Sequence, residues 1–239
     1  MVSLGNFFFR YRNGLFPLVY LLLLPRSAPL LPSFRLALVL GTAIALTGQL
    51  LRAVTMGLNH IRRSGKDRRV HATGLVQGGM YAHSRNPLYA GNLLILLGIG
   101  VASNSILFLV IAAPFFLITY RAIVAAEENF LRQQFGEEYT RYCQRVNRIV
   151  PNFAGLRQTL AGMSFDWRRL IAADYGSAFA WVAAITLVTL KNLWLAGEHR
   201  SDIFLTSAAC ATLAMAGLAY GCARFLKRSG MLKRVQAEA

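Results

Sequence analysis

The chain has 239 residues and a mass of 26.4 kDa, and its composition excludes more than its length does. Hydrophobic residues make up 55% of the chain and charged residues only 15%, whereas a soluble domain carries about 25% charged residues. A chain this apolar and aromatic would not stay disordered in water, so we interpret it as a membrane protein. The net charge of +16 raises nucleic-acid binding as an alternative, and the positions of the basic residues decide it.

Six apolar segments follow one another along the chain, at residues 14–31, 35–56, 88–103, 106–126, 175–195 and 203–223. A helix needs about 20 apolar residues to cross a bilayer, with about 17 to 25 tolerated. The first segment is interrupted by prolines and the third is short, so these two are marginal. We expect the first segment to be a retained anchor rather than a signal peptide, because no small-residue cleavage site is evident. The sequence therefore predicts an all-α, polytopic membrane helix bundle of about six transmembrane helices.

The basic residues gather on one side of these segments. They follow the second, fourth and sixth segments, as Arg62, Arg63, Lys66, Arg68, Arg69, Arg132, Arg141, Arg145, Arg148, Arg157, Arg168, Arg169, Arg224, Lys227, Arg228, Lys233 and Arg234. The other side keeps Arg26, Arg35, Lys191 and Arg200. This bias predicts cytoplasmic termini and long loops, and we expect the bacterial inner membrane as the location. It also accounts for the net charge without nucleic acid, since no basic helix is interleaved with stacking aromatics.

Two other classes of function are disfavoured. The chain has no His or Cys cluster at metal-ligand spacing, so no metal site is expected, and Cys143, Cys210 and Cys222 cannot form a disulfide framework. Transport is disfavoured because no polar residue is evident deep within the apolar segments and no inverted repeat is visible.

The third and fourth segments form a predicted helical hairpin. Pro87 suits the first turn of a helix, and the sequence Ser103-Asn104-Ser105 predicts a turn between the two helices. A hairpin of this length returns Glu127 and Glu128 to the membrane face at which its first helix begins, next to Arg85. We therefore predict that these residues meet at the cytoplasmic interface.

Simpler interpretations exist for each charge taken alone. Glu128 and Arg132 are four residues apart and could form a surface pair, and Arg85 could anchor a helix end among lipid phosphates. Together, however, the cation, the carboxylates and the nearby aromatics complement a zwitterionic amino acid joined to a flat base. S-adenosylmethionine has that chemistry, and a nicotinamide dinucleotide fits less well because its phosphates favour cations.

A two-part motif carries a family resemblance. The first part is Gly79-x-Tyr81-x-x-x-Arg85-Asn86-Pro87-x-Tyr89-x-Gly91, and the second is Glu127-Glu128-x-x-Leu131-x-x-x-Phe135-Gly136-Glu137-Glu138-Tyr139-x-x-Tyr142-x-x-x-Val146, followed by Pro151. Over residues 73–151 the chain resembles the integral-membrane methyltransferases, a group that includes isoprenylcysteine carboxyl methyltransferase and the phospholipid N-methyltransferases. The resemblance implies S-adenosylmethionine as cofactor and a membrane lipid or lipid-like, isoprenoid-type acceptor.

The resemblance also implies a set of site residues. Those expected to bind the cofactor are Thr73, Gly74, Leu75, Val76, Tyr81, Arg85, Asn86, Pro87, Leu88, Tyr89 and Glu127. As catalytic candidates we take Glu128, to orient or deprotonate the acceptor, and Arg145, to meet a headgroup charge. No metal is expected at this site.

The chain departs from the family pattern at two positions. Most relatives carry His where this chain has Asn86, and the carboxyl-methylating branch carries Arg where this chain has Ile123. The second departure puts methylation of a prenylcysteine carboxylate in doubt.

Two rival functions remain open: an NADPH-dependent membrane reductase of an unsaturated lipid, and a non-catalytic membrane subunit. We expect a single membrane domain, with N-terminal spans at 1–72, the catalytic hairpin and its following amphipathic helix at 73–151, and a C-terminal extension at 152–239.

Overall fold

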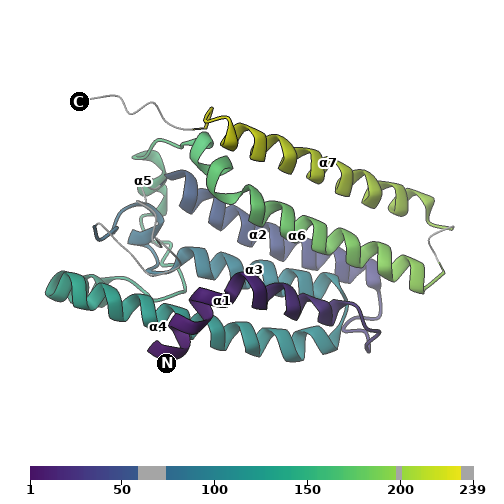
Figure 1. The fold of residues 1–239 in the computed structure, drawn as a ribbon, viewed down its shortest axis with the longest axis horizontal. Helices are drawn as coiled ribbons and strands as arrows, with labels where there is room; N and C mark the ends of the chain where they lie inside the picture. The colour runs from purple at the N-terminus through teal and green to yellow at the C-terminus, as the bar shows by residue number, and fades with distance from the viewer. Residues whose placement is uncertain (59–73, 198–200, 233–239) are drawn as a thin grey trace.

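The computed structural model describes residues 1–58, 74–197 and 201–232, and this part of the chain contains helices and no strand. The long helices lie side by side in one bundle (Figure 1). In chain order the helices, with two short 3-10 helices named η, are α1 (Val2–Tyr20), η1 (Leu21–Leu23), α2 (Phe34–Leu58), η2 (Gly79–Ala82), α3 (Pro87–Ala102), α4 (Ile106–Arg145), α5 (Leu156–Ala161), α6 (Trp167–Leu195) and α7 (Ile203–Arg228).

Four of the described helices, α2, α4, α6 and α7, are long and apolar enough to cross a membrane, and α3 is a shorter apolar helix. The prediction of an all-α membrane protein is therefore confirmed, whereas the number of six spans is not. The polar segment that was expected to form a separate amphipathic helix is the last part of α4, which the non-helical residue Gly136 divides from the rest, and its amphipathic role stays a prediction. A kink at Gly136, where φ is 50° and ψ is −119°, marks the change of direction.

The first helix differs most from its predicted position. The apolar segment was placed at residues 14–31, but α1 begins at Val2 and ends at Tyr20, with Pro17 inside it. Arg10 and Arg12 therefore belong to the helix rather than to its flank. Leu24 to Pro32 has no long helix, because Pro25 and Pro29 cannot supply the backbone N–H groups that a helix needs.

Small residues bring α2 and α3 into close contact, because side chains of this size let two helix backbones approach each other. A side-chain carbon added to Gly98 would lie 2.5 Å from the backbone nitrogen of Ala45 and 2.5 Å from the carbonyl oxygen of Gly41. One added to Gly48 would lie 2.6 Å from the carbonyl oxygen of Gly91. The backbones of the two helices therefore touch along this seam, which holds the start of the hairpin in place.

Gly98→Ala is expected to lower the free energy of unfolding by about 1 to 3 kcal/mol, because the two helices must separate to admit the methyl group. The matched control is Gly217→Ala on α7, where an added carbon meets nothing within 4 Å. Thermal unfolding of the purified protein in detergent would measure both variants. Equal unfolding temperatures for the two would contradict the close contact.

A buried charge pair joins α2 to α6, which corrects the sequence interpretation that no polar residue lies deep within the apolar segments. Arg52 on α2 donates hydrogen bonds to Asp174 on α6 and to Asn92 on α3. Gln49 donates to the other Asp174 oxygen at 2.6 Å. Because this cluster lies among three helices, it fixes α6 onto the hairpin module.

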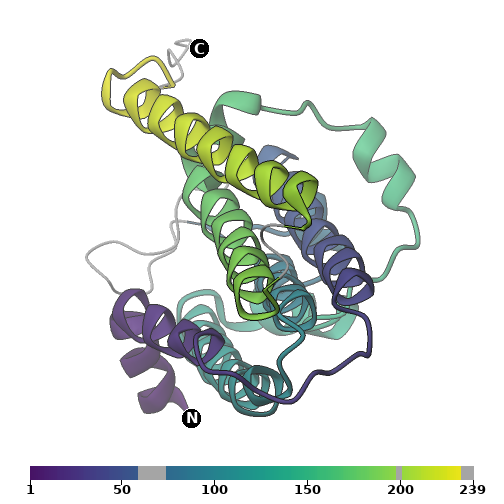
Figure 2. The ribbon, with the colours of Figure 1, turned by 90° about the vertical axis from the view of Figure 1, so that its right-hand side faces the viewer.

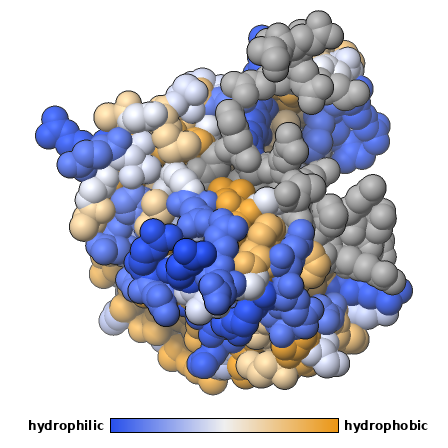
Figure 3. All heavy atoms as spheres, turned by 90° about the vertical axis from the view of Figure 1, so that its left-hand side faces the viewer, coloured by the Kyte–Doolittle hydropathy of each residue, from blue (hydrophilic) through white to orange (hydrophobic). Residues whose placement is uncertain are grey.

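The two ends of the bundle differ in polarity. The start of α3 and the end of α4 lie at the left-hand end in Figure 1. Seen from that end, the surface gathers hydrophilic residues around a small apolar patch, and apolar residues lie along the rim (Figure 3). Figure 2 shows α7 at the edge of the bundle beside α6, the helix against which it packs. The predicted site residues therefore lie at a polar end of an otherwise apolar bundle.

Candidate functional site

The first half of the motif forms an irregular entry into α3. Gly79 has a φ of 60°, a left-handed conformation that glycine adopts without strain, and it starts η2. Asn86 precedes the helix with a φ of −134° and a ψ of 55°, and Pro87 occupies its first turn. The first turn of a helix leaves its N–H groups unpaired, and proline has no N–H, so Pro87 suits this position. The entry therefore ends at Asn86 and α3 begins at Pro87.

The turn between α3 and α4 returns the second half of the motif to this entry. Asn104 takes a φ of 52°, and the Ser105 hydroxyl accepts a hydrogen bond from the Phe108 N–H at 3.2 Å, which caps α4. Along α4 the chain then runs back to Glu127. There the Tyr89 hydroxyl donates to Glu127 Oε1 at 2.8 Å, so the two halves of the motif meet as predicted.

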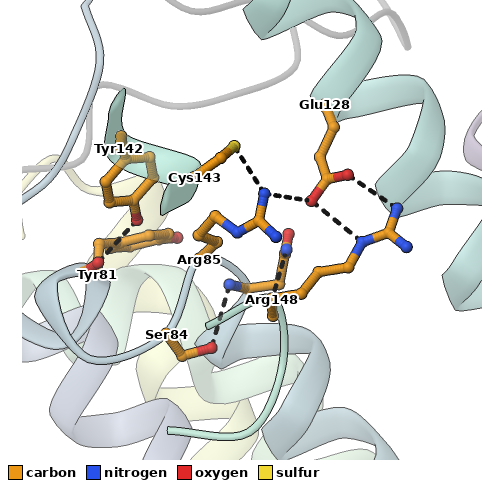
Figure 4. A network of polar contacts seen from close by, with 8 residues as sticks. Tyr81, Ser84, Arg85, Glu128, Tyr142, Cys143 and Arg148 are labelled. Carbon is orange, nitrogen blue, oxygen red and sulfur yellow. Dashed lines mark hydrogen bonds and ion pairs between the residues drawn. The ribbon is translucent and has the colours of Figure 1, made fainter. Parts of the chain in front are cut away.

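Glu128, the next residue, forms a second contact between the two halves. Its Oε1 lies 3.2 Å from Arg85 Nη1, and both of its oxygens accept from Arg148, at 3.1 and 2.8 Å (Figure 4). The predicted contact between Arg85 and the glutamates is thus present. Glu128 is only 8% exposed, so these three side chains form a partly buried ion-pair cluster rather than a pair on the surface.

The electrostatics of Arg85 reflect this cluster. Burial opposes the charged guanidinium, but the negative charge of Glu128, and less strongly Cys143, hold the pKa of Arg85 above its usual value. Arg85 Nη1 also donates to the Cys143 sulfur. Its Nε is buried with no hydrogen-bond partner among the described residues.

A backbone strap at residues 146–152 closes over the entry. The Arg85 N–H donates to the Asn147 carbonyl at 2.8 Å, and the Asn86 amide donates to the Arg148 carbonyl at 2.9 Å. The Ser84 hydroxyl donates to the Ile149 carbonyl at 2.9 Å. Asn86 therefore uses its side chain inside the protein, to hold the strap.

Tyr81, in the entry before α3, forms a hydrogen bond with the last part of α4. Its carbonyl accepts from the Tyr142 hydroxyl at 2.7 Å. Burial, and after it the negative charge of Glu127, raise the pKa of Tyr81. The hydrogen bond from Tyr142 holds the entry against the last part of α4.

Other predicted residues lie near the entry without joining this cluster. Gly74 is exposed, Leu75 and Val76 are half-buried in the stretch before η2, and Leu88 is half-buried in the first turn of α3. Thr73 lies outside the described residues. Arg145 donates to Gln77 at 3.4 Å and lines a shallow surface groove of about 390 Å³ with Glu138, Arg141 and Gln144.

Sequence reasoning did not single out three groups that the structure places here. Arg148 was counted only as a loop cation, although it follows the motif closely. Arg52 and Asp174 lie 122 residues apart, and the signal that could have found them is that each is a charge next to or within an apolar segment.

Ile123, at the position where one branch of the family has a cation, is fully buried in the core.

Comparison with known proteins identifies the central part of the chain. Residues 36–138 match the family described as phospholipid methyltransferase. The chain is 28% identical over 164 residues to the cobalt-zinc-cadmium resistance protein CzcN of Cupriavidus metallidurans, covering 64% of this chain and 69% of that protein. It is 31% identical over 86 residues to the nickel-cobalt-cadmium resistance protein NccN of Alcaligenes xylosoxydans xylosoxydans, covering 36% and 40%. No solved structure gives a significant match.

The matched segment contains α3, the entry before it and α4 through Glu138, so it includes the first half of the motif and the second half from Glu127 to Glu138. The match points to methyltransferase activity in general. Over residues 36–138 the chain carries the phospholipid methyltransferase family pattern, and the predicted resemblance to the integral-membrane methyltransferases is confirmed.

Proposed function

We propose that the protein transfers a methyl group from S-adenosylmethionine to a lipid-type acceptor at the cytoplasmic membrane interface. The observation that carries the proposal is the hydrogen bond between Tyr89 and Glu127 at the polar end of the hairpin, inside the segment that matches the methyltransferase family.

The residues present fit the proposed cofactor. Glu127 is a half-buried carboxylate, and among the described residues its hydrogen-bond partner is Tyr89 through one oxygen. The other oxygen can therefore accept from an ammonium group. The tyrosine rings offer aromatic faces for a base, and the extended stretch with Gly74, Leu75 and Val76 offers backbone N–H groups for a carboxylate.

When bound, S-adenosylmethionine would supply an electrophilic methyl carbon on a positively charged sulfur. The acceptor's lone pair forms the new bond to carbon as the carbon–sulfur bond breaks, and the sulfur keeps the bonding electrons. An amine or hydroxyl acceptor also loses a proton. The protein's contribution is chiefly to align the reactants and exclude water.

For Glu128 we propose the orienting role rather than deprotonation. Both of its oxygens already accept from arginines, so taking a proton would require breaking these pairs. For Arg145 we propose contact with a headgroup charge, supported by its place in the groove beside Arg141.

The relatives' names refer to metal resistance and name no reaction. We propose that any part this protein has in metal resistance would come through methylation of its acceptor. Cobalt and zinc ions therefore belong among the ligands to be tested.

Calorimetric titration of the detergent-purified chain with S-adenosylhomocysteine would test the proposal. We expect binding that Glu127→Ala weakens about ten- to hundred-fold, because a charge-assisted hydrogen bond to the ammonium is lost. Glu137→Ala, at an exposed position on the same helix, is the matched control and should bind as the unmodified chain does.

The rival functions give different results in the same titration. Binding of NADPH but not S-adenosylhomocysteine would favour a reductase, and binding of cobalt or zinc ions alone would favour a metal-binding protein. Folded protein that binds none of these ligands would favour a non-catalytic subunit.

A further inference from the structure

Helix α1 packs along α4. It lies before residues 36–138, the segment that matches the family. A side-chain carbon on Gly5 would lie 2.0 Å from the Ala122 carbonyl oxygen, so the two backbones touch one turn before Glu127. Farther along α1, the ring of Phe16 packs on Phe116 with centroids 4.9 Å apart. The two helices therefore run antiparallel, with the start of α1 beside the part of α4 that leads to Glu127, as Figures 1 and 2 show.

Arg12 lies on the face of α1 that packs against α4. Gly5, Phe9, Arg12 and Phe16 are separated by four, three and four residues, the spacing of one helix face. Gly5 and Phe9 are buried. Arg12 is thus a cation on an otherwise apolar contact stripe.

The side chain of Arg12 points back toward the Glu127 end. Its guanidinium carbon lies 4.3 Å from the ring centroid of Phe9, which is one turn nearer the start of the helix, as expected for a long helical side chain. At that end of α1, a side-chain carbon on Gly5 would meet Ala122 and Ala126, just before Glu127. The cation therefore faces the region where the two halves of the motif meet.

Arg12 forms no ion pair with any described residue, and Glu127 hydrogen bonds to Tyr89 instead. A cation among apolar helices is costly unless it is paired or used. Arg12 also lies seven residues beyond Gly5, roughly 10 Å deeper along α1 at 1.5 Å per residue.

We propose that Arg12 binds an anionic group, a carboxylate or a phosphate, on the lipid-type acceptor and so holds the acceptor beside Glu127. That the anion belongs to a methyl acceptor rests on the proposed function, but anion binding by Arg12 can be tested without it. It makes α1 part of the substrate site and selects acceptors that carry a negative charge.

The test is calorimetric titration of the full chain in a neutral detergent with hexadecanoate and with hexadecyl phosphate. Hexadecanol is the uncharged control ligand. We expect Arg12→Gln to weaken binding of at least one anionic ligand about ten- to hundred-fold, to leave hexadecanol unaffected, and to leave S-adenosylhomocysteine binding unchanged. Arg12→Lys should restore part of the loss. Arg10→Gln, at an exposed position on the same helix, is the matched control variant.

The outcomes separate the two proposals. Stronger dependence on Arg12 for hexadecanoate identifies a carboxylate acceptor, and for hexadecyl phosphate a phosphate-bearing one. Anion binding that does not depend on Arg12 would overturn the inference, as would loss of S-adenosylhomocysteine binding in Arg12→Gln, which would make Arg12 a cofactor ligand. Arg12-dependent anion binding in a chain that binds no S-adenosylhomocysteine would keep the anion site and refute the methyltransferase proposal.

Discussion

Asp174→Ala is expected to lower the free energy of unfolding by about 3 to 5 kcal/mol, because it leaves the Arg52 guanidinium buried without its counter-charge. Arg52 is 6% exposed and Asp174 2% exposed, so water cannot replace the lost carboxylate. Asn92 and Ser177 would remain as neutral hydrogen-bond acceptors. Reversible unfolding of the detergent-solubilised protein by denaturant would measure the change.

Two further variants show whether the loss comes from the unpaired charge. Arg35→Ala removes an exposed ion pair with Asp202, in which the Arg35 side chain is 72% exposed, and should cost less than about 1 kcal/mol. The double variant Arg52→Met with Asp174→Leu replaces both charges by apolar groups and should recover most of the stability. A loss in Asp174→Ala no larger than that in Arg35→Ala would contradict the buried pair.

This cluster also bears on the C-terminal extension, for which the sequence suggested no role. Asp174, Ser177 and Trp181 lie on the face of α6 that contacts α2, where the Trp181 indole donates to Gln49 at 3.0 Å. Because Arg52 joins this face to Asn92 on α3, α6 supports the helix that carries Tyr89. We infer that the extension holds the hairpin in position, beyond any role as an anchor.

The features that the sequence predicted well are those set by local signals. Pro87 fixes where α3 begins, and Ser105 caps α4 after the turn, so the hairpin follows from residues close together in the chain. Once the hairpin is known, helix length alone brings Glu128 back to Arg85. The small residues of α2 and α3 likewise indicate their own contact.

The features that the sequence could not show depend on contacts between distant parts of the chain. The strap at 146–152 has irregular backbone, and no periodic pattern indicates that it pairs with Arg85 and Asn86. The partner of Arg52 is visible only when α6 packs on α2. Arg12 lies before the predicted apolar segment at 14–31, and its place on the face that packs against α4 is visible only once α1 is known to begin at Val2.

The second large effect is expected for Glu128, which forms ion pairs with Arg85 and Arg148. Glu128→Gln is expected to reduce methyl transfer by at least about tenfold and to lower the free energy of unfolding by about 1 to 3 kcal/mol, because two guanidinium groups lose their shared charged acceptor. The Arg85 side chain is 14% exposed and that of Arg148 is 39% exposed, so Arg85 carries more of the cost. Glu137→Gln, exposed on the same helix, should leave both quantities unchanged.

The decisive comparison is with Arg148→Gln, which removes the bidentate partner and leaves the Glu128 carboxylate in place. If Glu128 acts by fastening the strap and orienting Arg85, Arg148→Gln should lower both transfer and stability as Glu128→Gln does, measured by product formation and by unfolding in the same detergent. If Glu128 instead takes a proton from the acceptor, Glu128→Gln should abolish transfer in a protein of normal stability while Arg148→Gln stays active. We expect the first result, because both oxygens of Glu128 face arginines, one in the entry before α3 and one in the strap that closes over it.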